Sequence, residues 1–449
     1  MNRAVPSFFM SEAVRASGIR HRIIGVTMLM AFVLYLDRIC MGEIVKSASF
    51  LGETGLEKAQ IGRILGAFYL SYAVMQIPAG WLSDRFGARS MLTFYIAAWS
   101  VCTAWTGMVN GFAGLMVARL LCGVAEAGAY PTSMALVRKW IPLEGRARAS
   151  GTVAFGGRIG GTLAPFLTIW MIVALGSWRY SLWVDGVLGL LIAAVFWAVT
   201  RSSPEEHPGV NDAELRLIGA VKQEAPLRLG ELWRVLGACV RNVGLWANAL
   251  CQTLINIGWG FLVTWLPTYL VEKHGVEPVQ GGRMLSGVLA LGMLGQIAGG
   301  YYCDWTTRRL GLRWGRVAPV MTAVIACAVA YACCPFLESV WGLVVCCALV
   351  SFFVDLGNPA TWAFMGDIGG RATAVAGGWG NMWGNLGASF GSVLVPWLMA
   401  RGQDHGTMPV FLTLSGAFAL AGLVVIPMDA TRRLFPETSE LKPEESSQV

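Results

Sequence analysis

Charged residues inside long apolar stretches are the groups of this sequence best placed to do chemistry, because a charge in hydrocarbon is costly and usually serves a function. Asp37 and Arg38 are adjacent, and Arg119 and Glu126 stand seven residues apart, which places both side chains on one helix face. Arg158 is a further arginine in such a stretch. Arginine binds a carboxylate through paired hydrogen bonds, and a carboxylate in a low-dielectric cavity binds a proton near neutral pH. We therefore expect a site that binds an anion and takes up protons.

The four histidines all fall in loops or at the ends of apolar stretches, which favours carboxylates as the proton carriers. Glu126 is the first candidate and Asp37 the second, and Arg38, Arg119 and Arg158 are the candidate anion ligands. A purely structural role stays open, because opposite charges also neutralise one another and fix helix packing. In that interpretation Asp355 balances Arg158.

Neutral polar groups in the same stretches could bind the hydroxyls of a substrate. The candidates are Tyr35, Tyr72, Gln252, Asn256, Asn381 and Asn385. The alternative for the amides is a hydrogen bond between helices. Asp185 is interpreted as structural or interfacial. Trp259, Trp379 and Trp383 could offer their aromatic faces to a carbon skeleton, but a packing or lipid-facing role is favoured for any one of them.

The elements that must position these residues are membrane helices. Of the 449 residues, 55% are hydrophobic and 14% charged, against roughly 25% charged in soluble proteins. An apolar run of about 20 residues spans a bilayer, and twelve such runs follow one another. The predicted spans are 22–46, 60–83, 90–110, 112–140, 147–174, 180–200, 242–272, 283–306, 316–336, 339–366, 372–400 and 408–429.

The chain divides into two related halves. We predict an N-terminal segment 1–21, a bundle of six helices over 22–200, a polar linker 201–241, a second six-helix bundle over 242–430, and a tail 431–449. Gln76, Gly80 and Asp84 recur 220 positions later, and the run that begins at Gly157 resembles the run at Gly384, 227 positions later. Such a repeat predicts an all-α membrane protein of two pseudo-symmetric bundles with a site between them.

Basic residues cluster in loops that lie on one side if the spans alternate, including the stretch before the first span and the stretch after the last. The positive-inside rule then places both termini in the cytoplasm. No signal peptide is recognised, and the absence of an N-x-[ST] sequon favours a bacterial inner membrane. The net charge of +7 therefore does not indicate nucleic acid. The 11 cysteines have no metal-binding spacing, so we expect no metal and no cofactor.

The segment Gly80-Trp-Leu-Ser-Asp84-Arg85-Phe-Gly87-Ala-Arg89 resembles the signature that the major facilitator superfamily carries between its second and third spans. The resemblance implies a cytoplasmic gate built from Gly80, Asp84, Arg85, Gly87 and Arg89. A degraded copy stands at Gly300–Arg309.

A narrower resemblance is to the anion:cation symporter branch, which includes hexuronate, galactonate and glucarate transporters. It is carried by Tyr35-Leu-Asp37-Arg38, by Tyr72–Gly80, by Arg119–Pro131 and by Gly384–Gly387. The resemblance implies that Asp37 and Glu126 bind protons and that Arg38, Tyr72, Arg119 and Asn385 contact a sugar acid. Arg158 departs from the neutral residue, often glutamine, of those transporters and would suit a dicarboxylate.

These observations predict a proton-coupled symporter of a small organic anion that works by alternating access, as a monomer in the lipid bilayer. The alternatives are a phosphate or sodium-driven anion carrier, an exchanger of two anions, and a receptor that binds an anion without moving it. No metal set, nucleophile elbow or phosphate loop indicates an enzyme.

Overall fold

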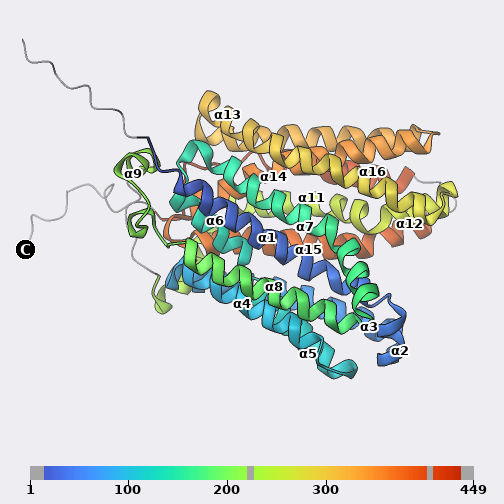
Figure 1. Cartoon of the computed structure of the whole chain (residues 1–449). Helices are drawn as coiled ribbons and strands as arrows, with labels where there is room; N and C mark the ends of the chain where they lie inside the picture. The colour runs from blue at the N-terminus through green and yellow to red at the C-terminus, as the bar shows by residue number, and fades with distance from the viewer. Residues whose placement is uncertain (1–14, 220–226, 402–407, 436–449) are drawn as a thin grey trace, which may run out of the picture.

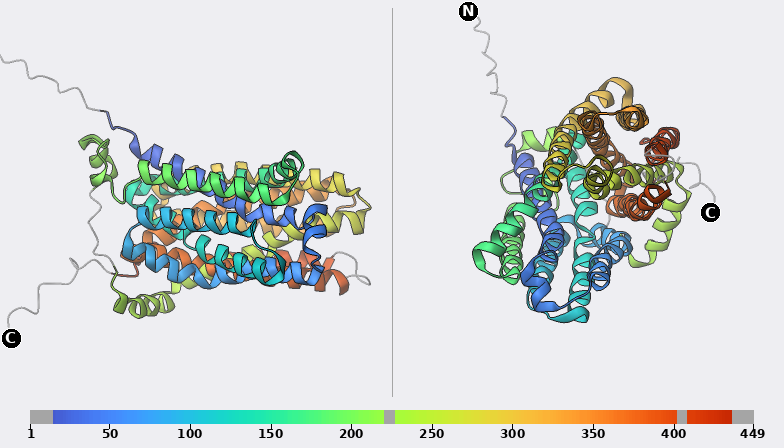
Figure 2. Two further views of the ribbon diagram at one scale, coloured as in Figure 1. Left: turned by 60° about the horizontal axis from the view of Figure 1, so that its bottom comes forward. Right: turned by 90° about the vertical axis from the view of Figure 1, so that its right-hand side faces the viewer.

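The computed structural model describes residues 15–219, 227–401 and 408–435, and within those ranges the chain folds into helices and turns without a strand. Most of the predicted N-terminal segment 1–21 and of the tail 431–449 lies outside the described residues. Long helices run side by side along one direction (Figure 1). In the end-on view of Figure 2 the helices of the first half stand on one side and those of the second half on the other.

The first half contains eight α-helices and a short η1 turn. They are α1 (Ile19–Ile44), the short α2 (Ala48–Thr54), α3 (Lys58–Phe86), α4 (Ala88–Thr106), α5 (Gly111–Glu126), α6 (Ala129–Trp140), η1 (Leu143–Gly145), α7 (Arg146–Leu175) and α8 (Trp178–Val199). The polar region between the halves carries α9 (Asp212–Ile218) and α10 (Leu232–Arg241). The second half contains α11 (Val243–Gly260), a π-helical turn (Phe261–Trp265), α12 (Leu266–His274), α13 (Pro278–Cys333), α14 (Val340–Gly369), α15 (Thr373–Arg401) and α16 (Met408–Val424).

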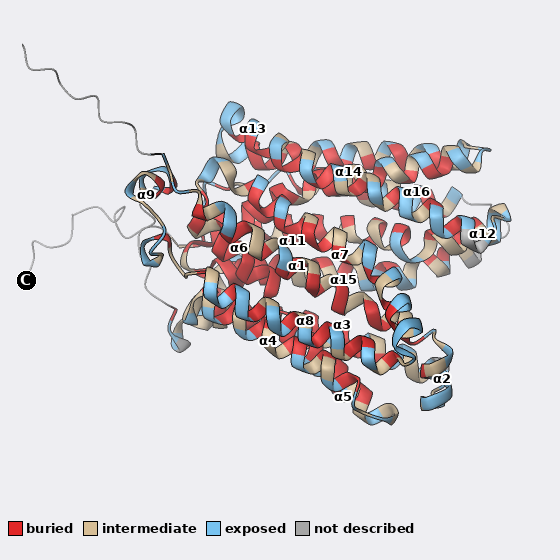
Figure 3. Cartoon of the chain, in the orientation of Figure 1, coloured by how far each residue is buried: buried red, intermediate tan, exposed pale blue. Residues whose placement is uncertain are grey.

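Helix α13 is two membrane helices that meet at Gly311, whose φ of +77° is a left-handed conformation that favours glycine. Seven regions of the described chain are long and apolar enough to cross a membrane, and the region Gln280–Phe336 contains both arms of α13. Helices α3 and α4, also predicted as spans, do not meet those criteria, and α16 is a shorter apolar helix. Large apolar side chains such as Val173 and Phe166 are exposed, as a lipid-facing surface requires. Figure 3 shows exposed residues along the outer faces of the long helices.

The predicted fourth span is divided into α5 and α6 by a turn at Ala127 and Gly128. Pro131 has no N–H and cannot bond the carbonyl of Ala127, which removes one helical hydrogen bond at this point. A side chain at Gly128 would collide with the ring of Tyr95, so the glycine permits close packing here. The break directly follows Glu126, the first candidate proton carrier.

Equivalent helices pack in the same way in both halves, which confirms the predicted internal repeat. Gly160 on α7 lies against the carbonyl of Phe32 on α1, and Gly387 on α15 lies against the carbonyl of Thr253 on α11. The two glycines are 227 positions apart, the spacing of the repeated run. A Cβ at either position would collide with backbone, so these glycines allow the helices to approach closely.

The region between the halves is fastened to the start of α1 by Glu214, a buried residue of α9. Its carboxylate accepts hydrogen bonds from the Ser17 hydroxyl and from the backbone N–H groups of Ile19 and Arg20, and it pairs with the Arg20 guanidinium at 3.1 Å. Burial opposes the charge, but these hydrogen bonds outweigh it and hold the pKa of Glu214 below its usual range. The contact is therefore at full strength at neutral pH and weakens as the pH falls below about 4.

We expect Glu214→Gln to release α9 from α1 at neutral pH. Hydrogen bonds to a charged group contribute about 1.5–3 kcal/mol, so local opening should become roughly tenfold more frequent or more. Limited trypsin digestion should show faster cleavage after Arg216, an exposed residue of α9. Glu205→Gln, at an exposed position nearby, is the matched control, and equal cleavage rates in the two variants would contradict the fastening role.

Candidate functional site

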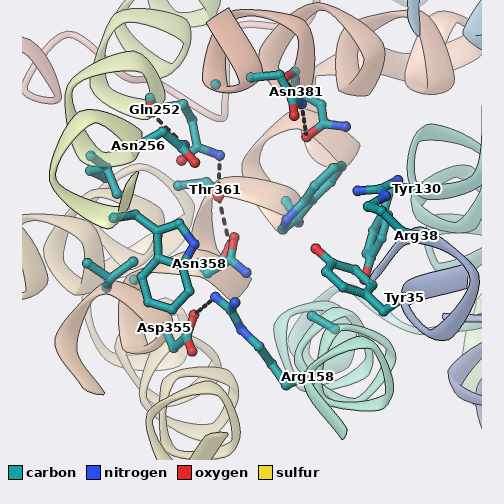
Figure 4. Close-up of a pocket in the computed structure, with 18 of the residues that line it drawn as sticks. Tyr35, Arg38, Tyr130, Arg158, Gln252, Asn256, Asp355, Asn358, Thr361 and Asn381 are labelled. Atoms are coloured by element: carbon teal, nitrogen blue, oxygen red, sulfur yellow. Dashed lines mark hydrogen bonds and ion pairs between the residues drawn. The ribbon is translucent and has the colours of Figure 1, made fainter. Parts of the chain in front are cut away.

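A central cavity of about 160 Å³ lies between the two halves (Figure 4). One water needs about 10–15 Å³ by this measure, so the space accommodates on the order of ten non-hydrogen atoms. The first half contributes Tyr35, Arg38, Tyr72, Tyr130, Ala154 and Arg158 to its lining, and the second half contributes mainly amides, Thr361, Asp355 and two tryptophans. A polar, two-sided cavity of this size suits a small hydrophilic solute.

Arg38 on α1 lies at the cavity wall and is paired with Glu126 at the end of α5. Its Nε and Nη2 donate to one Glu126 oxygen at 3.1 and 2.9 Å. The guanidinium also lies over the rings of Tyr72, at 4.4 Å, and Tyr35, at 5.2 Å. Because Glu126 is almost fully buried and Arg38 faces the cavity, the carboxylate holds the arginine from behind.

The remaining charged candidates of the first half lie behind the cavity wall. Asp37 is buried, and neither of its carboxylate oxygens accepts a hydrogen bond within the described residues. Asp185 on α8 is close enough to interact with it electrostatically. Arg119 on α5 is buried with its guanidinium 4.5 Å from the Phe68 ring, and it does not line the cavity. The structure thus brings Arg38 and Glu126 together and leaves Arg119 outside the cavity.

Arg158 on α7 lines the cavity and pairs with Asp355 on α14. This is an ion pair between the two halves. The Arg158 guanidinium also lies 4.2 Å from the ring of Trp259 on α11. Trp259 lines the cavity, which agrees with the alternative of an aromatic face offered to the solute, whereas Trp379 and Trp383 pack against Trp246.

The neutral candidates gather on the same cavity. Asn381 on α15 donates to the Tyr72 hydroxyl on α3 at 3.2 Å, which joins the two halves, and Asn385 donates to the carbonyl of Asn381. Gln252 on α11 donates to the Thr361 hydroxyl on α14 at 3.3 Å. These five residues all line the cavity, as do the other two neutral candidates, Tyr35 and Asn256.

Tyr130 on α6 and Trp362 on α14 close the cavity on one side. Their ring centroids are 5.5 Å apart, and both residues also line a second, much smaller cavity with Ser133, Met134 and Ser150. The aromatic pair therefore separates the central cavity from the end of the protein at which α9 lies, which we call the linker end (Figure 1).

The predicted gate motif lies at the linker end and crosses to the second half. Asp84 accepts hydrogen bonds from the N–H groups of Ala374 and Val375, at 3.0 and 2.9 Å, at the start of α15. These donors have no partner within their helix, and the positive end of the helix dipole attracts the carboxylate. Gly80 lies against the carbonyl of Ala374, so any side chain there would separate α3 from α15.

The other motif residues fix the turn that follows. Gly87 has a φ of +88°, which favours glycine. Arg89 donates twice to the carbonyl of Trp197 on α8 and lies over its ring at 3.8 Å. Arg85 contacts the carbonyl of Leu227 at 3.4 Å.

A second set of contacts repeats this gate with the halves exchanged. Asp304 on α13 accepts from the N–H groups of Ala147 and Arg148 at the start of α7, both at 3.3 Å, and pairs with the Arg148 side chain at 2.7 Å. Asp304 is 220 positions from Asp84. Arg146 beside it pairs with Asp367 on α14 at 2.6 Å. The degraded copy of the motif thus keeps its carboxylate and its role at a helix start.

Sequence reasoning missed several residues of the site. Asn358, Thr361 and Trp362 line the cavity, and Asp367 joins the halves. The first three are uncharged residues inside a predicted span, and Asp367 follows the end of that span, so none of them was singled out. The internal repeat is a signal for the gate alone, because it marks Asp304 as the counterpart of Asp84 in the second half.

A central polar cavity between two pseudo-symmetric helical bundles, closed at one end by reciprocal contacts, defines a membrane transporter. Residues 27–392 match the Major Facilitator Superfamily, and the chain belongs to that family. Members of this family transport solutes, and the Gly80–Arg89 motif predicted that this chain resembles them.

Curated relatives match over nearly the whole chain. The probable sulfoacetate transporter SauU of Cupriavidus necator is 30% identical over 91% of this chain and 94% of its own. The probable galactarate/D-glucarate transporter GudP of Escherichia coli K12 is 26% identical over 96% of this chain and 97% of its own. The D-galactonate transporter of Escherichia coli O6:H1 is 29% identical over 88% of this chain and 93% of its own. These matches confirm the predicted resemblance to the sugar-acid branch.

The fold also matches the crystal structure of the human organic anion transporter MFSD10, with a TM-score of 0.67 over 90% of this chain and 99% of that one. At 16% identity this comparison bears on the fold alone. It agrees with the expected major facilitator architecture.

We expect Asp84→Asn to weaken the closed linker end. An amide accepts more weakly than a carboxylate, and charged hydrogen bonds contribute about 1.5–3 kcal/mol, so exchange of the Ala374 and Val375 amide hydrogens should accelerate about tenfold or more. Asp304→Asn should do the same at Ala147 and Arg148. Hydrogen–deuterium exchange measures both effects, with Asp212→Asn as an exposed control. Unchanged exchange at these amides would show that the two carboxylates do not stabilise the closed gate.

Proposed function

We propose that this protein is a proton-coupled symporter of small organic anions that works by alternating access in a bacterial inner membrane. The observation that carries the proposal is the Arg38–Glu126 pair, in which a cavity-facing guanidinium is held by a buried carboxylate. Organic anions named for the relatives, among them sulfoacetate, galactarate, glucarate and galactonate, support the substrate class.

The pair supplies a physical link between proton and anion. While Glu126 is charged, it occupies two of the donors of Arg38. A proton on Glu126 neutralises it and frees Arg38 to bind a substrate carboxylate, and loss of the proton returns the arginine to Glu126. Proton and anion therefore bind together, because an unpaired charge at this depth is costly.

Asp37 is the second proton site of the proposal. Neither oxygen of its buried carboxylate accepts a hydrogen bond within the described residues. A buried carboxylate without compensating hydrogen bonds is costly, which supports Asp37 as a group that takes up a proton. Arg119, whose guanidinium lies 4.5 Å from the Phe68 ring, interacts electrostatically with Asp37 as a fixed positive charge of the first half. In this scheme Arg119 acts on the proton sites electrostatically, and contact with the substrate is left to Arg38, Tyr72, Asn381 and Asn385.

The transport cycle follows from the closed linker end. Basic loops assign that end to the cytoplasm. The cavity in this state then receives substrate from the far side, and opening requires Asp84 and Asp304 to release the starts of α15 and α7. Occupation of the cavity lowers the cost of that change by neutralising its charges.

We expect purified protein in liposomes to accumulate glucarate, galactonate or sulfoacetate when an inward proton gradient is imposed. Glu126→Gln fixes the neutral state, so its accumulation should fall to the level reached without a gradient, while exchange of internal for external substrate continues. The matched control is Glu43→Gln, on the same α1 helix as Arg38 but paired with the exposed Lys46.

If wild-type protein accumulates substrate without a proton gradient but only in the presence of sodium, then sodium and not the proton is the coupling ion. Full gradient-driven accumulation by Glu126→Gln would remove Glu126 from proton coupling. Binding without any uptake or exchange would identify a receptor rather than a transporter.

A further inference from the structure

The Arg158–Asp355 pair is built like the Arg38–Glu126 pair. In both, a guanidinium at the cavity wall is held by a carboxylate that is almost fully buried: the side-chain exposures are 23% and 1% for Arg158 and Asp355, and 11% and 2% for Arg38 and Glu126. Figure 4 shows both arginines among the residues around this cavity, with Tyr35 between them and the Arg158 guanidinium directed at Asp355. The cavity therefore contains two guanidinium groups rather than one.

Most of the hydrogen-bonding capacity of Arg158 is unused. Among the described residues its side chain donates only to one oxygen of Asp355, although a guanidinium has five N–H donors. The second oxygen of Asp355 is buried and accepts no hydrogen bond there. A pair that served only to fix the helices would be stabler with these groups satisfied or replaced by apolar ones. The free donors of Arg158 face the cavity, where a ligand can reach them.

We propose that Arg158 is a second anion subsite, that Asp355 is its resident competitor, and that the transported substrate carries two acidic groups, one bound by Arg38 and the other by Arg158. This inference rests on the proposed function and specifies its substrate class as small dianions. The amides of the second half, Gln252, Asn256 and Asn358, line the same cavity and suit hydroxyl groups between the acidic ends.

Charge balance supports a dianion. In the structure the two guanidinium charges are balanced by Glu126 and Asp355. A dianion bound to both arginines while both carboxylates stay charged would leave two uncompensated negative charges at this depth, which is costly. One proton on each carboxylate restores neutrality, so each acidic group of the substrate enters with one proton. A monoanion requires only the Arg38 pair to open and leaves Arg158 on Asp355.

The surroundings of Asp355 allow this proton. The charged or titratable groups that interact with it are the Arg158 guanidinium from α7 and the Cys327 thiol from α13. Trp259 on α11 faces Arg158 and carries no charge. Once a substrate carboxylate or sulfonate takes over Arg158, no other cation within these contacts holds Asp355 in its charged form.

The Arg158–Asp355 pair also joins the two bundles. The second acidic group of the substrate, by replacing this contact, therefore affects the transport cycle. Arg158 belongs to α7 and Asp355 to α14, so their contact must change when the bundles move apart on this side. A bound dianion replaces the direct contact with Arg158–substrate contacts that leave Asp355 free to move. Monoanions lack this effect.

The test compares pairs of probes that differ by one acidic group: glucarate with gluconate, and sulfoacetate with methanesulfonate. Because Arg158→Gln alone would leave Asp355 unpaired, the variant is Arg158→Gln/Asp355→Asn, with Arg432→Gln at an exposed site as control. In proton-driven liposome uptake, wild-type protein should prefer each dianion. The double variant should lose dianion uptake about 20-fold or more, as expected for removal of a charged hydrogen-bonding group, and keep monoanion uptake within about threefold.

A second variant guards against a general folding defect. Asp355→Asn keeps the guanidinium and removes its competitor, so its KM for glucarate should fall several-fold while its KM for gluconate stays constant. The number of protons taken up per glucarate should fall by one. A purely structural pair would change neither the ratio of dianion to monoanion nor the proton count.

Equal effects of the double variant on both members of each probe pair, or a wild-type preference for the monoanions, would overturn the second subsite while leaving organic anion symport intact. Uptake of none of the four probes by wild-type protein would overturn both the subsite and the proposed function.

Discussion

The structure depends on one constraint: a charge placed at the depth of a bilayer must be neutralised by a partner. Arg38 and Arg158 meet it through Glu126 and Asp355, and at the linker end the buried Arg316 and the partly buried Arg146 both pair with Asp367. Each of these contacts is exchangeable, because a proton or an anion can take the place of one partner. A transporter uses that property: its solute and its coupling ion become partners in pairs that already exist.

The need for a charge to have a partner is met differently at the linker end and in the central cavity. At the linker end, Asp84 and Asp304 accept hydrogen bonds from backbone N–H groups at helix starts, so these contacts break when the helices that carry the N–H groups move away. In the cavity the partners are side chains that respond to protons and anions. The chemistry of the cavity and the movement at the linker end are linked because α7 and α14 contribute to both.

The internal repeat explains why the gate consists of two equivalent sets of contacts, whereas the two walls of the cavity differ in their side chains. Close glycine contacts and carboxylates at helix starts recur in both halves, since they depend on backbone geometry that the repeat preserves. The side chains around the cavity have diverged. The first half supplies both arginines, whereas the second half supplies amides such as Gln252 and Asn385. The result is one cationic wall and one wall of neutral hydrogen-bonding groups, an arrangement suited to a hydroxylated anion.

The sequence by itself determined the helical membrane architecture, the repeat and the gate motif, because apolar length, glycine spacing and a loop signature are local properties of the chain. It also identified the charged residues that needed partners. It did not decide the pairings: Arg119 and Glu126 share a helix face by spacing, yet Glu126 binds Arg38 from another helix and Arg119 lies on Phe68. The sequence offered the Arg158–Asp355 pair and a cavity-facing Trp259 only as alternatives, which the structure now shows. Those facts depend on how helices far apart in the chain are rotated and packed, which only the tertiary structure fixes.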